Sequence, residues 1–371
     1  MSVEWRSDKD FTVQAVSSFV RIFTWDTRED CSVFVCPLSH TWSEVTFDEV
    51  IVKGGHEDIG KRMRGIPAIY DLNVRKKVVD KFKDYAQIVS YSMPAPEIMA
   101  SNPNQVEEYC KILNDGFAEM CAKDSDHFPG WVAQVPMGAP DSGARECVRA
   151  LKNGACGVQI YTNIAGKPLD NPEFTPFWET MNKLGKPIWL HPTRGANFPD
   201  YLSEKKSKFE IWWTFGWSYE TGAAMARLVF SKIMDNYPKL KIITHHFGGI
   251  VPMLEGRIGP GWDQIGARTS DEDLQALKKS LKKKRPLDYF KHSFYADTAA
   301  FTGIPATHAG LAFYDKDKIV FASDCPFDPE KGTMYIRETL KILDGIKMPA
   351  AQRKAIMYGN LERITGKKFV K

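Results

Sequence analysis

The stretch Leu240-Lys241-Ile242-Ile243-Thr244-His245-His246-Phe247-Gly248-Gly249 changes from apolar and β-branched residues to polar residues and glycine. A short run of this kind predicts a buried strand, which we place at residues 241–245. The segment Ile319 to Phe327 has the same arrangement and ends in Ser323-Asp324-Cys325-Pro326-Phe327. A third, Pro187-Ile188-Trp189-Leu190-His191-Pro192, ends on another histidine. Each polar group therefore follows a strand, and the carboxyl ends of strands are where barrel enzymes keep their chemistry.

These strand ends also predict a metal site. Imidazoles and a carboxylate from separate strands form a ligand set that Zn²⁺ or Mn²⁺ prefers. Taken alone, each histidine would be interpreted as a hydrogen-bonded core residue, and the aspartate before Cys-Pro as a turn former. Three such positions at strand ends, in a chain with only eight histidines, favour the metal site.

The order of apolar segments along the chain predicts a barrel. Eight strand-like segments alternate with helical patterns, the number needed for a closed parallel TIM-type (β/α)8 barrel. Among the helices, Asn104 to Cys121 carries an apolar stripe with helical spacing, and residues 140–153 and 221–236 behave similarly. The expected strands are Ser32–Leu38, Gln87–Ser92, Val132–Pro136, Gly157–Ile160, Ile188–His191, Lys241–His245, Phe294–Asp297 and Ile319–Ser323.

No repeat, low-complexity tract or Gly/Pro/Ser-rich linker divides the 371 residues. We therefore expect a single α/β domain over residues 1–371, with 1–37 as an atypical N-terminal segment and an irregular first strand. The aromatic segment Ile211-Trp212-Trp213-Thr214-Phe215-Gly216-Trp217 is too short for a membrane span. We expect it to be buried in the core or at a subunit contact, and lining an aromatic substrate pocket is the alternative.

The charge of the chain argues against a nucleic-acid partner. The net charge is +4 and the isoelectric point is near 8.5, which is only mildly basic. The one basic run, Lys278 to Arg285, follows the acidic stretch Ser270-Asp271-Glu272-Asp273 and precedes Pro286. Acids in the first turn and bases in the last complement a helix dipole, so we interpret the run as a solvated surface helix.

Seven scattered cysteines, without a CxxC pair, indicate reduced thiols in a cytoplasmic protein. The charged N-terminus is unlike a secretory signal, and no apolar stretch approaches the length of a membrane span.

From about Ile69 to the C-terminus, a series of short motifs resembles one known group. That group is the decarboxylase-type branch of the amidohydrolase superfamily, which includes aminocarboxymuconate-semialdehyde decarboxylase and γ-resorcylate decarboxylase. The order of the motifs is more specific than any one of them. They are Ile69-Tyr70-Asp71 with Arg75, Gln87-Ile88-Val89-Ser90, Gly157-Val158-Gln159-Ile160, Leu190-His191-Pro192, Glu220-Thr221, Tyr237 to Ile242, His246-Phe247-Gly248-Gly249 with Pro252 and Arg257-Ile258, Phe294 to Asp297, Ser323 to Phe327, and Gly359-Asn360.

The resemblance implies roles for individual residues. His191 and Asp324 would be metal ligands, and His246, rather than its neighbour His245, would be the acid/base beside the metal. In the family, a first-strand HxH or Glu-x-His motif completes the site. The nearest match is Leu38-Ser39-His40, in which His40 fits the second ligand but Leu38 cannot bind a metal. The site would then be weakened, completed by another residue, or lost. Arg62 or Arg64 lies near the position of a family arginine that holds the substrate carboxylate, and surface solvation is the alternative for both.

These residues suit non-oxidative decarboxylation of a small aromatic or muconate-like carboxylic acid, aided by one Zn²⁺ or Mn²⁺ per chain. Hydrolysis of an amide, lactone or ester on the same scaffold stays open, as does a barrel that binds a ligand without catalysis. The segment Gly157 to Tyr161 lacks the lysine or glutamate that bridges two metals in related hydrolases, so a single metal is expected. Apolar surface around Ala223, Arg227 and Phe230 predicts a homodimer.

Overall fold

A computed structural model describes residues 12–17, 62, 65–91, 94–100, 102–269, 273–300 and 303–369. Eight strands within these ranges form one parallel sheet, and their order in the sheet is their order in the chain. A doubly wound sheet would reverse direction at a switch point, whereas a sheet that always adds the next strand on the same side curls into a TIM-type barrel. The strands are β1 (Thr12–Ser17), β2 (Tyr85–Ser90), β3 (Gly130–Gln134), β4 (Gly157–Tyr161), β7 (Pro187–His191), β8 (Lys241–Thr244), β9 (Tyr295–Asp297) and β10 (Ile319–Val320).

Seven of the eight strand predictions fall on observed strands, to within a few residues at their ends. The expected first strand, Ser32–Leu38, lies outside the described residues. The strand that pairs in parallel with β2 is instead β1, which comes from the N-terminal segment. A short antiparallel pair, β5 (Asn163–Ile164) and β6 (Lys167–Pro168), stands apart from the sheet.

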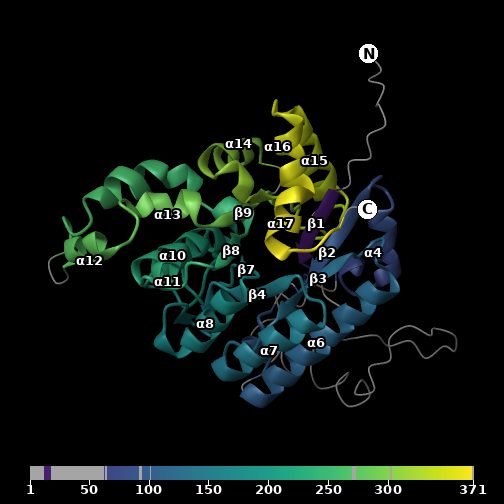
Figure 1. Ribbon diagram of the computed structural model, residues 1–371, viewed down its shortest axis with the longest axis horizontal. Helices are drawn as coiled ribbons and strands as arrows, with labels where there is room; N and C mark the ends of the chain where they lie inside the picture. The colour runs from purple at the N-terminus through teal and green to yellow at the C-terminus, as the bar shows by residue number, and fades with distance from the viewer. Residues whose placement is uncertain are drawn as a thin grey trace.

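Helices cover the outer face of the sheet, as Figure 1 shows for those that follow β2 to β4. The longest is α6, where Pro103 occupies the first turn and Asn102 caps the amide of Asn104 at 2.9 Å. Its predicted apolar stripe is buried from Val106 to Met120. The helices are α3 (Pro67–Tyr70), α4 (Leu72–Val79), α5 (Pro96–Met99), α6 (Pro103–Lys123), α7 (Pro140–Lys152), α8 (Thr175–Leu184), α9 (Ile211–Thr214), α10 (Gly216–Phe230), α11 (Ile233–Asn236), α12 (Leu274–Ser280), α13 (Pro286–His292), α14 (Ile304–Phe313), α15 (Met334–Gly345), α16 (Ala350–Lys354) and α17 (Asn360–Thr365).

Two helix predictions need correction. The pattern over residues 221–236 is two helices, because Lys232 between α10 and α11 adopts a left-handed φ of 66°. The basic run is helical only as far as Ser280, where α12 ends, and Lys282 and Lys283 lie in the connection to α13. No helix in the described ranges is long and apolar enough to cross a membrane.

The barrel interior holds a layer of buried polar side chains beneath the carboxyl ends of the strands. Gln87 of β2 and Gln159 of β4 are fully buried, and the Gln87 Oε1 accepts a hydrogen bond of 2.8 Å from Arg75 Nε. The Gln159 Nε2 donates to the Tyr91 carbonyl at 2.7 Å. These contacts fill the interior, so open chemistry belongs at the strand ends above it.

Candidate active site

His191 is the last residue of β7 and is almost fully buried. Its Nδ1 lies 2.7 Å from the Pro192 carbonyl oxygen, which can only accept, so Nδ1 carries the proton and Nε2 keeps its lone pair. Burial, followed by the nearby His246, lowers the pKa of His191 to about 3, so the ring is neutral at neutral pH. A neutral imidazole with one nitrogen held by a carbonyl is the form that binds metal ions.

His245 and His246 follow β8 directly, but their surroundings differ. The His246 Nδ1 donates to the Ala299 carbonyl at 2.8 Å, while His245 Nε2 is buried without a hydrogen-bond partner among the described residues. The rings of His191 and His245 lie 4.9 Å apart, edge to face. Burial lowers the pKa of His246 to about 4 and that of His245 well below its usual range. All three histidines thus gather at one edge of the barrel as neutral rings.

The turn that presents His246 uses left-handed backbone. His246 and Phe247 have φ of 54° and 52°, and Gly248 and Gly249 continue with 72° and 65°. Added side chains at the two glycines would collide with the Tyr314 hydroxyl and the Ser218 carbonyl, respectively. The ring of Phe247 packs where Gly310 of α14 has no side chain. The shape of this turn therefore requires the two glycines, and non-glycine residues with left-handed backbone, such as His246 and Phe247, often mark functional sites.

Two carboxylates complete the cluster. Asp297 ends β9, and its Oδ1 accepts from the amides of His246 (2.9 Å) and Ala299 (3.0 Å). Burial raises the pKa of Asp297 to about 7. Burial raises the pKa of Asp324, beyond β10, well above its usual range; Asp297 adds to this, while Arg62 opposes it. Asp324 also has a left-handed φ of 63°.

The arginine and N-terminal candidates are only partly described. The exposed Arg62 donates through its guanidinium to the Phe327 carbonyl, three residues beyond Asp324, and is thus on the side of the barrel expected from the sequence. Arg64, His40 and Leu38 lie outside the described residues.

Aromatic side chains surround His191. Tyr161, at the end of β4, and Trp217, in α10, both meet the His191 ring edge to face at 5.7 Å. The segment 211–217 is expected in the core or at a subunit contact. Burial in the core is wrong, because none of the residues of α9 is buried and Phe215 is 73% exposed, whereas the subunit contact stays a prediction. The alternative role, lining an aromatic substrate pocket, stays a prediction, which the contact of Trp217 with the His191 ring supports.

Asp297, Arg194 and Glu220 are site residues to which the sequence assigned no role. Arg194 follows β7, and its Nη1 lies 3.9 Å from the Glu220 carboxylate. Glu220 accepts from the Thr162 hydroxyl at 2.9 Å and from the Asn163 amide. Burial raises the pKa of Glu220, with the hydrogen bonds opposing it. Asp297 ends a predicted strand, so the strand-end rule applied to His191 would have found it.

The fit of these residues to a divalent metal ion is partial but chemically sound. Across the described ranges, no three His, Cys, Asp or Glu side chains are close enough to hold an ion together. The neutral His191 with its lone pair at Nε2, the orphaned His245 Nε2 and two carboxylates that disfavour each other's charge nevertheless suit a cation. His191 and Asp324 would hold it, and further ligands would have to come from a rearrangement or from the part of the chain not described.

Comparison with curated proteins identifies decarboxylases as relatives. The chain is 28% identical over 302 residues to γ-resorcylate decarboxylase from Polaromonas sp., covering 78% of this chain and 86% of that protein. It is also 28% identical over 206 residues to 2-amino-3-carboxymuconate-6-semialdehyde decarboxylase from Dictyostelium discoideum, covering 55% of each.

Solved structures share the fold. A 5-carboxyvanillate decarboxylase from Novosphingobium aromaticivorans, crystallised with manganese, superposes with a TM-score of 0.78 at 19% identity, over 99% of this chain and all of that one. A 2,6-dihydroxybenzoate decarboxylase in complex with 2,6-dihydroxybenzoate gives a TM-score of 0.71 at 21% identity, over 96% of this chain and all of that one.

The sequence model of the amidohydrolase family matches residues 40–366, from the expected first-strand histidine to the last helix. The match spans most of the chain. It includes the ends of β4, β7, β8, β9 and β10, which carry the candidate site residues, and leaves out β1. This protein belongs to the amidohydrolase family.

Proposed function

We propose that this protein is a metal-dependent non-oxidative decarboxylase, a carboxy-lyase, of a small aromatic or muconate-like carboxylic acid. The observation that carries the proposal is the neutral His246 ring, whose Nδ1 is fixed on the Ala299 carbonyl next to His191. The relatives named as decarboxylases support the same reaction type. The metal would be one Zn²⁺ or Mn²⁺ per chain, and manganese is bound in the carboxyvanillate decarboxylase.

The bound metal would supply Lewis-acid polarisation of a substrate oxygen and orient the carboxylate. His191 and Asp324 would hold it, with His40 as the expected third ligand. Arg62 stands beside Asp324 and carries a fork of donors that suits a second carboxylate oxygen. Arg64 is the other candidate for that role. Trp217, which meets the His191 ring edge to face and is only partly buried, adds aromatic surface beside it, in keeping with a planar substrate.

His246 moves the proton. Because Nδ1 donates to Ala299, the proton to be transferred resides on Nε2 of the imidazolium. Bound substrate is an anion, and a nearby negative charge raises the pKa of the ring and so favours its protonated form. The proton passes to the carbon that bears the carboxylate. The carbon–carbon bond then breaks, its electron pair restores conjugation in the product, and CO₂ leaves.

The deciding experiment measures CO₂ release from hydroxybenzoates, aminobenzoates and muconate-like acids by protein loaded with Mn²⁺ or Zn²⁺. A decarboxylase releases CO₂ and proton-capped product in equal amounts. Hydrolysis of amide, lactone or ester substrates without CO₂ release would replace this function with the single-metal hydrolase. A well-folded protein that takes up no metal and turns over neither group would instead be a ligand-binding barrel.

We also propose a cytoplasmic homodimer. Phe230, on the expected interface, packs on Trp262 at 5.0 Å, so this part of the face is covered within the chain. Other large apolar side chains are exposed, including Phe209 before α9 and Tyr219 on α10. Sedimentation at micromolar concentration should give a dimer, and a monomer would contradict this.

All five cysteines in the described ranges are free thiols, which suits a reducing compartment such as the cytoplasm. Cell fractionation can check this localisation.

A further inference from the structure

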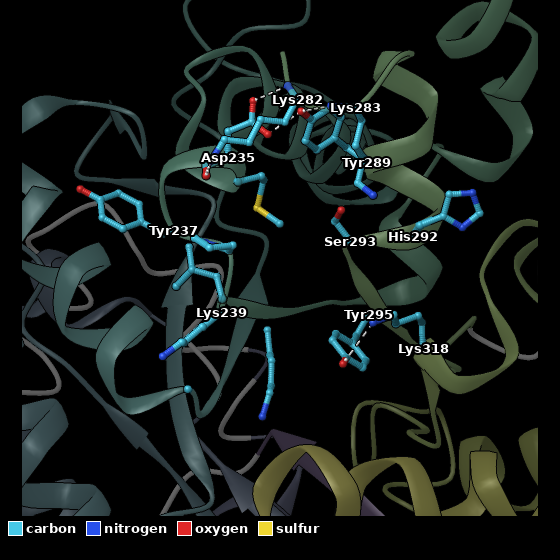
Figure 2. Close-up of a pocket in the computed structure, with 15 residues that line it drawn as sticks. Asp235, Tyr237, Lys239, Lys282, Lys283, Tyr289, His292, Ser293, Tyr295 and Lys318 are labelled. Carbon is cyan, nitrogen blue, oxygen red and sulfur yellow. Dashed lines mark hydrogen bonds between the residues drawn. The ribbon is translucent and has the colours of Figure 1, made fainter. Parts of the chain in front are cut away.

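A cavity lies at the opposite end of the strands from the candidate active site. Its volume is about 600 Å³, and its walls include the start of β8 at Lys241 and the start of β9 at Tyr295. The connection between α12 and α13 forms another wall, through Lys282 and Lys283 (Figure 2). Since β8 has four residues, the two sites are separated by roughly 10 Å of strand.

Lysine side chains dominate this cavity. Five of them line it: Lys239, Lys241, Lys282, Lys283 and Lys318. In the described part of the chain, none of the five forms an ion pair within 4.0 Å, whereas eight other lysines do. Cations from three separate segments of the chain therefore converge without ion-pair partners among the described residues.

The lining lysines contact neutral groups instead. Lys241 Nζ donates to the Ile364 carbonyl at 3.2 Å, and Lys282 Nζ donates to the Asp235 carbonyl at 2.6 Å. Lys318 Nζ lies 4.3 Å above the Tyr295 ring and 3.3 Å from its hydroxyl. None of these contacts neutralises a charge, and each lysine keeps further N–H donors.

The only carboxylate among the lining residues is already committed. Asp235 accepts from the Tyr289 hydroxyl at 2.5 Å and from the Lys282 amide at 3.0 Å. Figure 2 shows Asp235, Lys282 and Tyr289 grouped at one side of the cavity, with Tyr295 and Lys318 on another. The opposite side therefore lacks a negative group.

The cations disfavour one another. Burial lowers the pKa of Lys241; Tyr295 opposes this shift, while Lys186, Arg363 and Lys318 add to it. Such mutual repulsion costs free energy in the folded protein unless an anion offsets it. A solvated basic surface would spread its charges apart, whereas here they surround one hollow.

We propose that this cavity binds a small phosphate-bearing anion with two or more negative charges. Donors reach the cavity from β8, from the α12–α13 connection and from Lys318 before β10, which suits a tetrahedral group better than a planar carboxylate. Tyr289 and Tyr295 add aromatic surface beside the cations, enough for an organic phosphate ester.

Pyrophosphate binding by the full-length protein, measured by isothermal titration calorimetry, tests this proposal without reference to the decarboxylase reaction. Wild type should bind saturably, and Lys241→Gln/Lys318→Gln should weaken binding by about tenfold or more. The matched control, Lys152→Gln/Lys347→Gln, removes the same charge at exposed sites outside the cavity and should bind as wild type does. Equal weakening by both pairs would show that the overall charge of the protein, rather than the cavity, accounts for the binding. That result would overturn the proposed site.

Two further measurements test the preference for phosphate and provide a second variant in case the first one unfolds. Citrate, whose anionic groups are planar carboxylates, should bind at least tenfold more weakly than pyrophosphate, and equal affinity would overturn the phosphate assignment. Because Lys318 packs on Tyr295, the first variant could unfold. If it unfolds, Lys239→Gln/Lys283→Gln replaces it, because this pair leaves the contact between Lys318 and Tyr295 intact. This variant should weaken pyrophosphate binding by the same factor. Wild type without saturable pyrophosphate binding up to about 10 mM would end the proposal.

Discussion

The backbone amide of His246 donates a hydrogen bond of 2.9 Å to the side chain of Asp297, across the gap between β8 and β9. The same oxygen accepts the amide of Ala299, whose carbonyl in turn holds His246 Nδ1. Asp297 thus supports both the backbone and, through Ala299, the ring of the proposed acid. It touches no expected substrate atom and is a positioning residue.

Two substitutions of Asp297 distinguish the effect of its hydrogen bonds from the effect of its negative charge. Asparagine keeps an oxygen that can accept both amides, so Asp297→Asn should retain most of kcat. Asp297→Ala removes the support, and a shift of about 1 Å in the acid can lower kcat by about a hundredfold. Steady-state kinetics with pH profiles for both variants checks this. Equal losses in the two would mean that the charge of Asp297, rather than its geometry, matters.

Asp324 should be required for metal retention. Asp324→Ala removes a direct ligand and loosens the others, so metal content measured by inductively coupled plasma mass spectrometry should fall from about one per chain to near zero. Asp115→Ala, which removes an exposed carboxylate far along the chain on α6, is the control and should keep its metal. Equal metal in wild type and Asp324→Ala would remove Asp324 from the ligand set.

The neighbouring histidines should differ in their effect on turnover. His246→Asn should lower kcat by about a hundredfold or more while metal content and folding are kept, because a positioned acid/base contributes that much. His245→Asn should cost less in turnover. If His245→Asn is the more damaging and spares the metal, the proton is carried by His245 and the assignment is wrong by one residue.

Leu38 holds the place of a metal ligand in the expected first-strand motif. Leu38→His should raise metal affinity and decarboxylase activity together, because a third imidazole adds a direct bond. Competition with a fluorescent chelator measures the affinity. Stoichiometric metal in wild type, unchanged by Leu38→His, would show that another residue already supplies the ligand.

His127 should make stability depend on pH. Burial opposes its protonation, but the hydrogen bonds that its ring nitrogens donate to the carboxylates of Asp124 and Asp80, at 2.7 and 2.9 Å, outweigh this and raise its pKa above 6.5. A raised pKa stabilises the folded state below pH 6.5, and this stabilisation is lost as the pH rises through the folded-state value. The side chain is 28% exposed, so the contribution is below about 1 kcal/mol.

Urea unfolding at pH 6 and pH 8 measures this contribution. His127→Gln should lose less stability than wild type between the two pH values. His308→Gln, at an exposed histidine of α14 for which the described residues offer no ion pair, should behave as wild type does. Identical pH dependence in all three proteins would contradict the role of His127.

The positions of the strand ends could be predicted, because a short run of apolar and β-branched residues indicates a buried strand from the local sequence alone. That is why His191, His246 and Asp324 could be placed at one edge from sequence alone, and why β7 and β8 match their predicted ranges so well. Arg194 and Trp217 could not be placed, because they lie in and beyond the long connection after β7, whose path is set by tertiary contacts. Lys282 and Lys283 were assigned to a helix because local charge order does not reveal that α12 ends at Ser280.

The close packing of the Phe247 ring against Gly310 restricts which residues can occupy these two positions in the family. The ring occupies the volume that any side chain at position 310 would need, so the two positions share one space. A larger residue at 310 can be accepted only together with a smaller one at 247, because the larger residue alone would push the His246 turn out of place and the smaller one alone would leave a cavity. Among descendants of a common ancestor, residues 247 and 310 should therefore covary in size, an imprint of the active-site turn carried by a helix that contributes no chemistry.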